Sequence, residues 1–302
     1  MKTEKIKVPY IKGEYRNVYT PAGDVYRGID TENFKNGNYY GEWITNDFTI
    51  LKGTDGVYHA YGITHPRTPE FKNAFDYEGN VHEAENQLFH VSFNGTLKEL
   101  YENGQFTEYE KVLYPQERYL HPECWAPCMV KKEGRCHIFW SPGKMQTAST
   151  QDMFRFDVDK GFLFEGNPWM RDPYIFEENG IYNMFYLDNG LKVRTSSDLS
   201  NWSEERVVQN MPFGKGDQES PCVIKRHGYY YLLWCIYDGT NGCYDERTYV
   251  FASKTIDGFA DATPITMLKG HAPEIMEEDG EDYILSVFYP GNGLNIAKIE
   301  WE

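Results

Sequence analysis

The chain has 302 residues, of which 40% are hydrophobic and 25% charged, a composition typical of a folded globular protein. Lysine and arginine number 30 against 46 aspartates and glutamates, so the formal net charge is −16. This charge argues against nucleic acid and anionic membranes as partners, because both attract a basic surface. No apolar run approaches the ~18 residues of a membrane span.

The N-terminal stretch and the cysteines bear on the compartment. The segment MKTEKIKVPYIKGEYRNVYT carries lysines but lacks the apolar core of a signal peptide. We therefore expect a cytoplasmic protein, or a secreted or periplasmic one if a leader has been removed. The six cysteines form no C-x-x-C pair, which favours buried reduced thiols over a thiolate metal site; disulfides stay open if the protein is exported.

One pattern recurs five times along the chain. Each copy has a β-rich run, a short polar turn containing glycine and a second run rich in aromatics, and this is the chemistry of a β-hairpin. Of the 49 aromatic residues, which make up 16% of the chain, 19 fall in these five segments. The copies are NDFTILKGTDGVYHAYGITH (46–65), WAPCMVKKEGRCHIFWSP (125–142), RDPYIFEENGIYNMFYLD (171–188), ESPCVIKRHGYYYLLWCIYD (219–238) and HAPEIMEEDGEDYILSVFYP (271–290).

The spacing of the copies predicts the architecture. A third-strand motif follows each of the first four hairpins, and the prolines at 127, 173, 221 and 273 are separated by 46, 48 and 52 residues. A period near 40–50 residues with about four strands per unit is typical of a β-propeller. We predict an all-β, five-bladed β-propeller that forms one domain over 1–302. Blades start near 41, 121, 168, 215 and 267, residues 1–40 pack on the propeller, and LNIAKIEWE supplies a last strand. A β-sandwich is the alternative.

The first strand of each blade lines the central channel, so equivalent starts point at one pocket. The residues at these starts are Asp47, Ala126, Asp172, Glu219 and His271. Carboxyl groups crowded in a partly dry pocket cannot all ionise, so one becomes a proton donor while another stays a carboxylate. Glycoside hydrolysis requires such a pair. The alternative is that these acids cap turns or bind a structural cation.

Neighbouring residues extend the predicted site. Arg171 could hold Asp172 ionised and donate to sugar hydroxyls, and Asn46 could bind a hydroxyl. His271 could contact substrate or ligate a structural Ca²⁺ ion in the channel, although the chemistry requires no cofactor.

The pocket rim has its own candidates. His65 ends a second strand there, and Trp43 and Trp125 stand beside channel positions where an aromatic face could stack on a sugar. The insertion in the first unit carries His82, Glu83 and Glu85, which either form a wall of the site or belong to a solvated loop.

At this point the sequence resembles the five-bladed propeller glycoside hydrolases, most closely glycoside hydrolase family 43 and its relatives in families 32, 62, 68 and 117. The resemblance covers about 41–302 and includes W-A-P at 125–127 and the turn at 197–202. It implies that Asp47 is the general base, Asp172 the residue that tunes pKa and orients substrate, and Glu219 the general acid. It also implies a channel calcium near His271.

Three motifs are similar to families 32 and 68: Asn46-Asp47, Arg171-Asp172-Pro173 and Glu219-Ser220-Pro221. In those families the first Asp is a nucleophile and configuration is retained. Phe48 departs from the proline that usually follows the family 43 base.

We therefore expect an enzyme, a glycosidase that cleaves terminal furanose or pentose residues of a carbohydrate substrate, as an α-L-arabinofuranosidase or β-xylosidase does, with inversion. The alternatives are a retaining β-fructofuranosidase-like hydrolase, a non-catalytic glycan-binding propeller and a glycoside phosphorylase.

Overall fold

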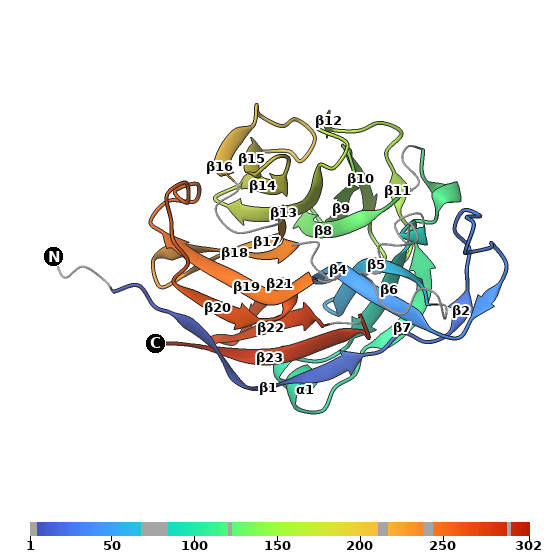
Figure 1. The fold of residues 1–302 in the computed structure, drawn as a ribbon, viewed down its shortest axis with the longest axis horizontal. Helices are drawn as coiled ribbons and strands as arrows, with labels where there is room; N and C mark the ends of the chain where they lie inside the picture. Colours follow the sequence, from blue (N-terminus) through green and yellow to red (C-terminus); the bar gives the residue numbers. More distant parts are fainter. Residues whose placement is uncertain (1–4, 68–83, 120–122, 211–216, 238–243, 289–290) are drawn as a thin grey trace.

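The computed structural model describes residues 5–67, 84–119, 123–210, 217–237, 244–288 and 291–302. Within these ranges the chain forms five antiparallel sheets arranged around a central channel (Figure 1). The five-bladed propeller predicted from the hairpin repeat is confirmed.

The strands of each sheet follow one another from the channel outward. The first sheet consists of β4 (Trp43–Lys52), β5 (Tyr58–Pro66), β6 (Leu88–Phe93) and β7 (Thr107–Val112). The second has β8 (Trp125–Lys132), β9 (Arg135–Ser141), β10 (Lys144–Thr150), β11 (Asp157–Val158) and β12 (Phe164–Glu165). The third has β13 (Arg171–Glu178), β14 (Ile181–Leu187), β15 (Leu191–Ser196) and β16 (Arg206–Gln209). The fourth has β17 (Asp217–Arg226), β18 (Tyr229–Tyr237), β19 (Tyr244–Ser253) and β20 (Thr266–Lys269).

The fifth sheet joins the two ends of the chain. It contains β21 (His271–Glu278), β22 (Glu281–Val287), β23 (Leu294–Trp301) and, outermost, β1 (Pro9–Tyr19). Figure 1 shows the dark blue β1 lying along the red β23, and their register runs from Pro9 opposite Trp301 to Tyr19 opposite Leu294. The segment LNIAKIEWE is thus the third strand of its blade, and the N-terminal segment supplies the fourth.

Smaller elements lie outside the five sheets. A two-stranded ribbon pairs β2 (Asp24–Val25) with β3 (Tyr39–Tyr40), and helix α1 (Leu97–Glu102) connects β6 to β7. A 3-10 helix covers Pro115–Glu117. The Thr96 side chain and Glu99 form a capping box at the start of α1, which explains why a helix begins there.

Tight turns explain why the hairpins form where the sequence predicts them. In four of them the two loop residues both have positive φ, as a type I′ turn requires, and the second is glycine: Glu133-Gly134, Asn179-Gly180, His227-Gly228 and Asp279-Gly280. This turn type matches the twist of the paired strands and fixes their register. The register in turn decides which residues reach the channel.

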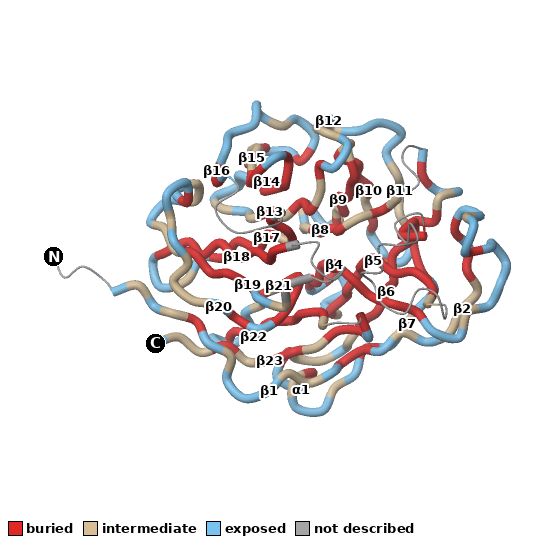
Figure 2. Tube along the Cα trace, in the orientation of Figure 1, coloured by how far each residue is buried: buried red, intermediate tan, exposed pale blue. Residues whose placement is uncertain are grey.

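The core lies between and within the blades. Figure 2 shows buried residues along the inner strands and exposed residues along the outer loops. The largest fully buried side chains are aromatic, including Trp140, Trp234, Tyr231 and Phe251, so most of the aromatic excess serves packing. The five described cysteines are buried and free. Among the described helices, none is long and apolar enough to cross a membrane.

Candidate active site

Every first strand carries a bulge at its channel end. In four sheets the bulge follows a paired residue of the first strand, which is Trp125, Arg171, Glu219 or His271. From this pair to the next, the first strand advances by three residues while the antiparallel second strand moves back by two. In the first sheet the same irregularity lies at Asn46 and Asp47, between the paired residues 45 and 48. A bulge leaves two residues opposite one and re-aims their side chains.

In the four later blades the bulge combines a positive φ with a proline. Ala126, Asp172, Ser220 and Ala272 have φ between 38° and 57°, and each precedes a proline. Such a φ is uncommon for residues other than glycine and clusters at functional sites. These are the residues that line the channel pocket together with Asp47.

This register corrects one prediction. The sequence interpretation treated Glu219 and His271 as equivalents of Asp172, but they occupy the paired position before the bulge, as Arg171 does. Ser220 and Ala272 stand where Asp172 stands. The three acids therefore occupy three different positions at the bulge. Glu219 is the paired residue before it, Asp172 comes one residue after the paired position, and Asp47 comes two residues after it.

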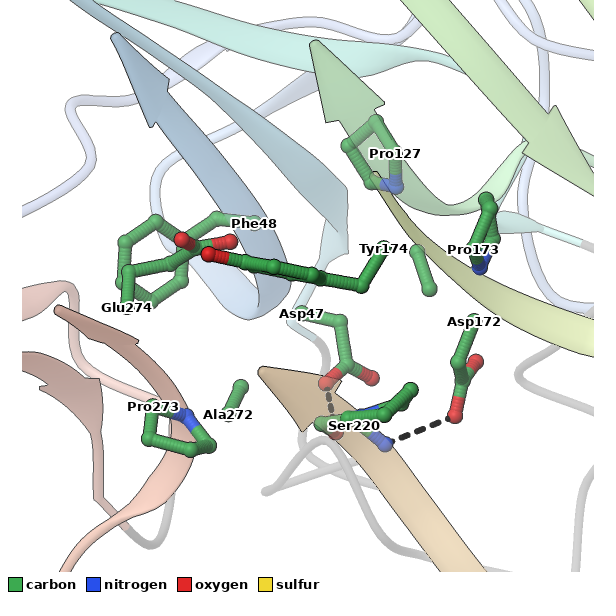
Figure 3. Close-up of a pocket in the computed structure, with 12 residues that line it drawn as sticks. Asp47, Phe48, Pro127, Asp172, Pro173, Tyr174, Ser220, Ala272, Pro273 and Glu274 are labelled. Atoms are coloured by element: carbon green, nitrogen blue, oxygen red, sulfur yellow. Dashed lines mark hydrogen bonds between the residues drawn. The ribbon is translucent and has the colours of Figure 1, made fainter. Parts of the chain in front are cut away.

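Ser220 connects two of the acids. Its hydroxyl donates a hydrogen bond to Asp47, and its backbone N–H donates to Asp172 Oδ2 at 3.0 Å. Figure 3 shows Ser220 between the two carboxylates, with both hydrogen bonds drawn. One residue of the fourth blade thus orients an acid of the first blade and an acid of the third.

Arg171 connects the third acid, Glu219, to Asp172. A guanidinium nitrogen donates to Glu219 Oε1 at 3.1 Å, and Nε lies 3.7 Å from Asp172 Oδ2. Glu219 is only 7% exposed, and its second oxygen, Oε2, has no hydrogen-bond partner among the described residues. A buried carboxyl oxygen without a partner favours the protonated form of the group.

The pKa values of the three acids are all raised, and burial is the largest cause in each. For Asp47 the Ser220 hydrogen bond partly opposes burial and the pKa is about 6. For Asp172 the Arg171 charge opposes burial while Asp47 adds to it, and the pKa is about 7. Burial raises the pKa of Glu219 well above its ordinary value despite Arg171. Burial thus favours the protonated form of Glu219, while the Ser220 hydrogen bond favours the ionised form of Asp47.

Two predicted neighbours lie beside this cluster. His271 is buried, with Nε2 3.6 Å from Asp47 Oδ1. Asn46 is buried in the same bulge as Asp47. The structure therefore brings together Asn46, Asp47, Asp172, Glu219, Arg171 and His271.

Two predicted substrate contacts are core residues. Trp43 is 3% exposed, has Lys111 Nζ 4.0 Å from its ring centroid and packs against Tyr26, so it presents no free face to a sugar. His65 is buried against Phe34, and its Nδ1 lies 2.9 Å from the Pro66 carbonyl. Neither side chain is exposed, because the segment containing the β2–β3 ribbon packs on this side of the first blade. A substrate contact by Trp43 or His65 stays a prediction.

Trp125 differs from Trp43. It is half-buried, and its ring lies nearly parallel to that of Trp169, with an interplanar angle of 15° and a centroid distance of 6.2 Å. Sequence reasoning did not name Trp169, since it falls outside the repeated hairpin.

Of His82, Glu83 and Glu85, the three insertion residues singled out from the sequence, one lies in the described part of the chain. Glu85 is 2% exposed, and its charge raises the pKa of Asp47, which places it in the electrostatic environment of the site. His82 and Glu83 lie outside the described residues.

Sequence reasoning also missed Tyr174 and Glu274, which line the pocket together with Phe48 (Figure 3). Burial raises the pKa of Glu274 well above its ordinary value, and Asp47 adds to the effect. The signal was available in the repeat, because both residues directly follow a blade-start proline.

The channel side chains include possible ligands for a metal ion. Among the described residues, no group of three or more His, Cys, Asp or Glu side chains is placed to hold one. His271 and Asp47 form a pair only, so a channel calcium stays a prediction in which His271 is the protein ligand.

The fold is a five-bladed β-propeller with acids at its channel, and comparisons with known proteins bear on the fold. No family model and no curated protein sequence matches the chain. Solved structures do match. CoXyl43, a family 43 β-xylosidase/α-arabinofuranosidase from a compost microbial metagenome, aligns with a TM-score of 0.65 and 14% identity over 97% of this chain and 95% of its own.

Two further structures extend the comparison. A GH43_1 enzyme from Xanthomonas citri aligns with a TM-score of 0.61 and 14% identity, covering 85% of this chain and 87% of its own. Sucrose-6-phosphate hydrolase from Lactobacillus gasseri aligns with a TM-score of 0.60 and 14% identity, covering 86% of this chain and 59% of its own. The resemblance to the propeller hydrolases is confirmed for the fold.

Proposed function

We propose that the chain is a glycoside hydrolase that removes terminal furanose or pentose residues from a carbohydrate by acid–base catalysis with inversion. The observation that carries the proposal is the cluster of three buried carboxyl groups joined by Arg171 and Ser220. Burial raises the pKa of all three, and the Ser220 hydrogen bond opposes this effect at Asp47. Pairs of acids whose surroundings separate their pKa values mark acid–base assignments.

The proposed reaction assigns one proton transfer to each of two acids. Glu219, protonated near neutral pH, gives its proton to the glycosidic oxygen as the bond to the anomeric carbon breaks. Asp47, ionised, takes a proton from the water that attacks the same carbon from the opposite face. Water is consumed, and the products are the free sugar and the shortened alcohol. Arg171 then stabilises the Glu219 carboxylate that the reaction leaves behind.

Asp172 is assigned an orienting role. It accepts from the Ser220 N–H and sits 3.7 Å from Arg171 Nε, so it links the residue that holds Asp47 to the residue that holds Glu219. Its charge raises the pKa of Glu219, and this favours the acid form.

The substrate class is supported by fold similarity and by charge. CoXyl43 is described as a β-xylosidase/α-arabinofuranosidase and was solved in complex with xylotriose. A neutral sugar suits a pocket of buried acids in a chain of net charge −16, whereas an anionic ligand would be repelled.

The test is a screen of aryl glycosides of arabinofuranose, xylose and fructose, followed by arabinan, xylan and fructan oligosaccharides. We expect release of one terminal sugar by the wild-type chain and none by the Asp47→Asn or Glu219→Gln variants. Wild-type inactivity on every substrate, combined with tight glycan binding by calorimetry, would favour a binding module. Turnover that depends on added phosphate would favour a phosphorylase.

A retaining β-fructofuranosidase-like reaction is the second candidate. It is favoured by the R-D-P and N-D motifs and by the fold similarity to sucrose-6-phosphate hydrolase. In that reaction Asp47 would attack the anomeric carbon itself. NMR of the first product distinguishes the two, since inversion gives the opposite anomer and retention the same one.

A further inference from the structure

Trp169 is the one exposed tryptophan of the described chain, at 65% exposure. One side of it is partnered, because its ring lies nearly parallel to that of the half-buried Trp125. Large exposed aromatic surface beside a pocket is a common mark of a binding site, and tryptophan supplies large contact area there.

The loop that carries Trp169 is held in place. Its backbone N–H donates to Asn167 Oδ1 at 2.7 Å, and the Asn167 side chain donates in turn to Asp188. Lys192 Nζ lies 3.1 Å from the other Asp188 oxygen, so the chain of contacts ends on β15 of the third blade. A side chain held on a fixed loop loses little freedom when a ligand stacks on it.

Arg171 connects the loop that carries Trp169 to Glu219, the proposed general acid. One guanidinium nitrogen donates to the Trp169 carbonyl at 3.3 Å, and the other donates to Glu219 Oε1 at 3.1 Å. The Trp169 backbone and the Glu219 carboxyl therefore both accept hydrogen bonds from a single guanidinium group. The general acid contacts the leaving-group oxygen, so the sugar that follows this oxygen extends from the Glu219 side of the pocket.

We infer that Trp125 and Trp169 form an aromatic platform that binds the ring of the leaving-group sugar, so that the substrate is an oligosaccharide rather than a simple alkyl glycoside. This inference rests on the proposed function for its assignment of the leaving-group side. The platform makes its contact through the apolar C–H face of the sugar ring, which indole surface removes from water.

The experiment compares Trp169→Ala and Trp169→Phe with wild type on arabinotriose and xylotriose, using whichever the wild-type chain hydrolyses. We expect Trp169→Ala to raise KM about tenfold or more with kcat within twofold, and Trp169→Phe to retain most of the affinity. The corresponding methyl glycoside has no leaving-group ring, so its kcat/KM should not change. A matched control is Met267→Ala, which removes an apolar side chain of similar exposure from the outer strand β20.

Two outcomes overturn the platform: an unchanged KM for the trisaccharide, or an equal loss on trisaccharide and methyl glycoside, which would indicate general damage. A binding assay separates this failure from failure of the proposed function. Quenching of tryptophan fluorescence by the trisaccharide is measured in Glu219→Gln and in the double variant with Trp169→Ala. Quenching lost only in the double variant supports the platform even if the wild-type chain proves inactive.

Discussion

Two acids on neighbouring first strands have opposite surroundings. Glu278, at the outer end of β21, accepts from Lys52 Nζ and Tyr58 OH, each at 2.9 Å, and from the Leu97 N–H at 2.5 Å. Glu219, at the channel end of β17, accepts from the Arg171 side chain and shares this guanidinium group with Asp172. Burial tends to raise the pKa of both, but the three donors lower that of Glu278, whereas that of Glu219 stays well above its ordinary value.

The contrast separates an acid that holds the fold together from acids that can exchange protons. A carboxylate that accepts three hydrogen bonds is stable as an anion at neutral pH. A buried acid that shares its donor is held near the point of protonation, which is useful for catalysis and costs stability. The variants below test this difference.

The largest expected effect is on catalysis. Asp47→Asn or Glu219→Gln should each reduce kcat by ~10²–10⁴-fold, the range that acid–base groups contribute. Glu278→Gln, the matched amide substitution outside the channel, should leave kcat unchanged. Steady-state kinetics on the substrate found by the screen measures all three, and circular dichroism checks that each variant is folded. Comparable turnover by wild type and both channel variants would remove the assignment.

The next effect is on stability, and its pH dependence has a defined sign. The pKa of Asp172 is about 7 in the folded chain against an ordinary value of 3.8, so the folded state binds more protons between these values and stability falls as pH rises. Asp172→Asn removes this cost. We expect it to be more stable than wild type by on the order of 2 kcal/mol at pH 8.5 and equal near pH 4 in urea titrations. A less stable variant at pH 8.5 would contradict the raised pKa.

A smaller effect concerns the pH profile. The Ser220 hydroxyl donates to Asp47 and lowers its pKa, so Ser220→Ala should move the acid limb of kcat/KM to higher pH by about one unit. Alanine suits the backbone, since Ala126 and Ala272 hold the equivalent bulge position with positive φ. Ser92→Ala removes a buried hydroxyl that donates to Tyr109 and serves as the control. An unmoved acid limb would show that another group sets it.

The smallest effect is at Glu278. Its lowered pKa means that it contributes stability above the ordinary pKa of a glutamate, and that this contribution is lost as pH falls. Glu278→Gln should therefore be less stable than wild type by about 1 kcal/mol at pH 7 and equal to it in acid. The stability difference from wild type should thus grow with pH for both Glu278→Gln and Asp172→Asn, with opposite signs, in the same urea titrations. A Glu278→Gln deficit that persists unchanged in acid would point to lost packing rather than lost charge.

The fold was predictable because the repeat is local. Each hairpin carries its own turn chemistry, as in Asn179-Gly180, and its period reveals the propeller without any long-range information. The pairing of β1 with β23 was not predictable in the same way. The N-terminal segment reads as a strand, but nothing in its sequence specifies a partner about 290 residues away.

The site was predictable in composition but not in register. Asp47, Asp172 and Glu219 stand out as acids at blade starts, yet only the paired strands reveal that Ser220 rather than Glu219 matches Asp172. A one-residue difference of this kind depends on where the bulge falls. Trp43 looked like a sugar contact because nothing in its own strand shows that Lys111 and Tyr26 cover it. Trp169 belongs to a connection that varies between blades, so the repeat could not identify it.

The pairing of β1 with β23 has a consequence for biosynthesis. The strand that completes the last blade is made before the other strands of the five blades, and its pairing with β23 can form only when that segment has been made. A ribosome adds residues one after another, so the ring stays open, with an unpaired edge, while the residues between β1 and β23 are made. Closure of such a distant contact is slow, and the nascent chain must be protected from aggregation until the two ends meet.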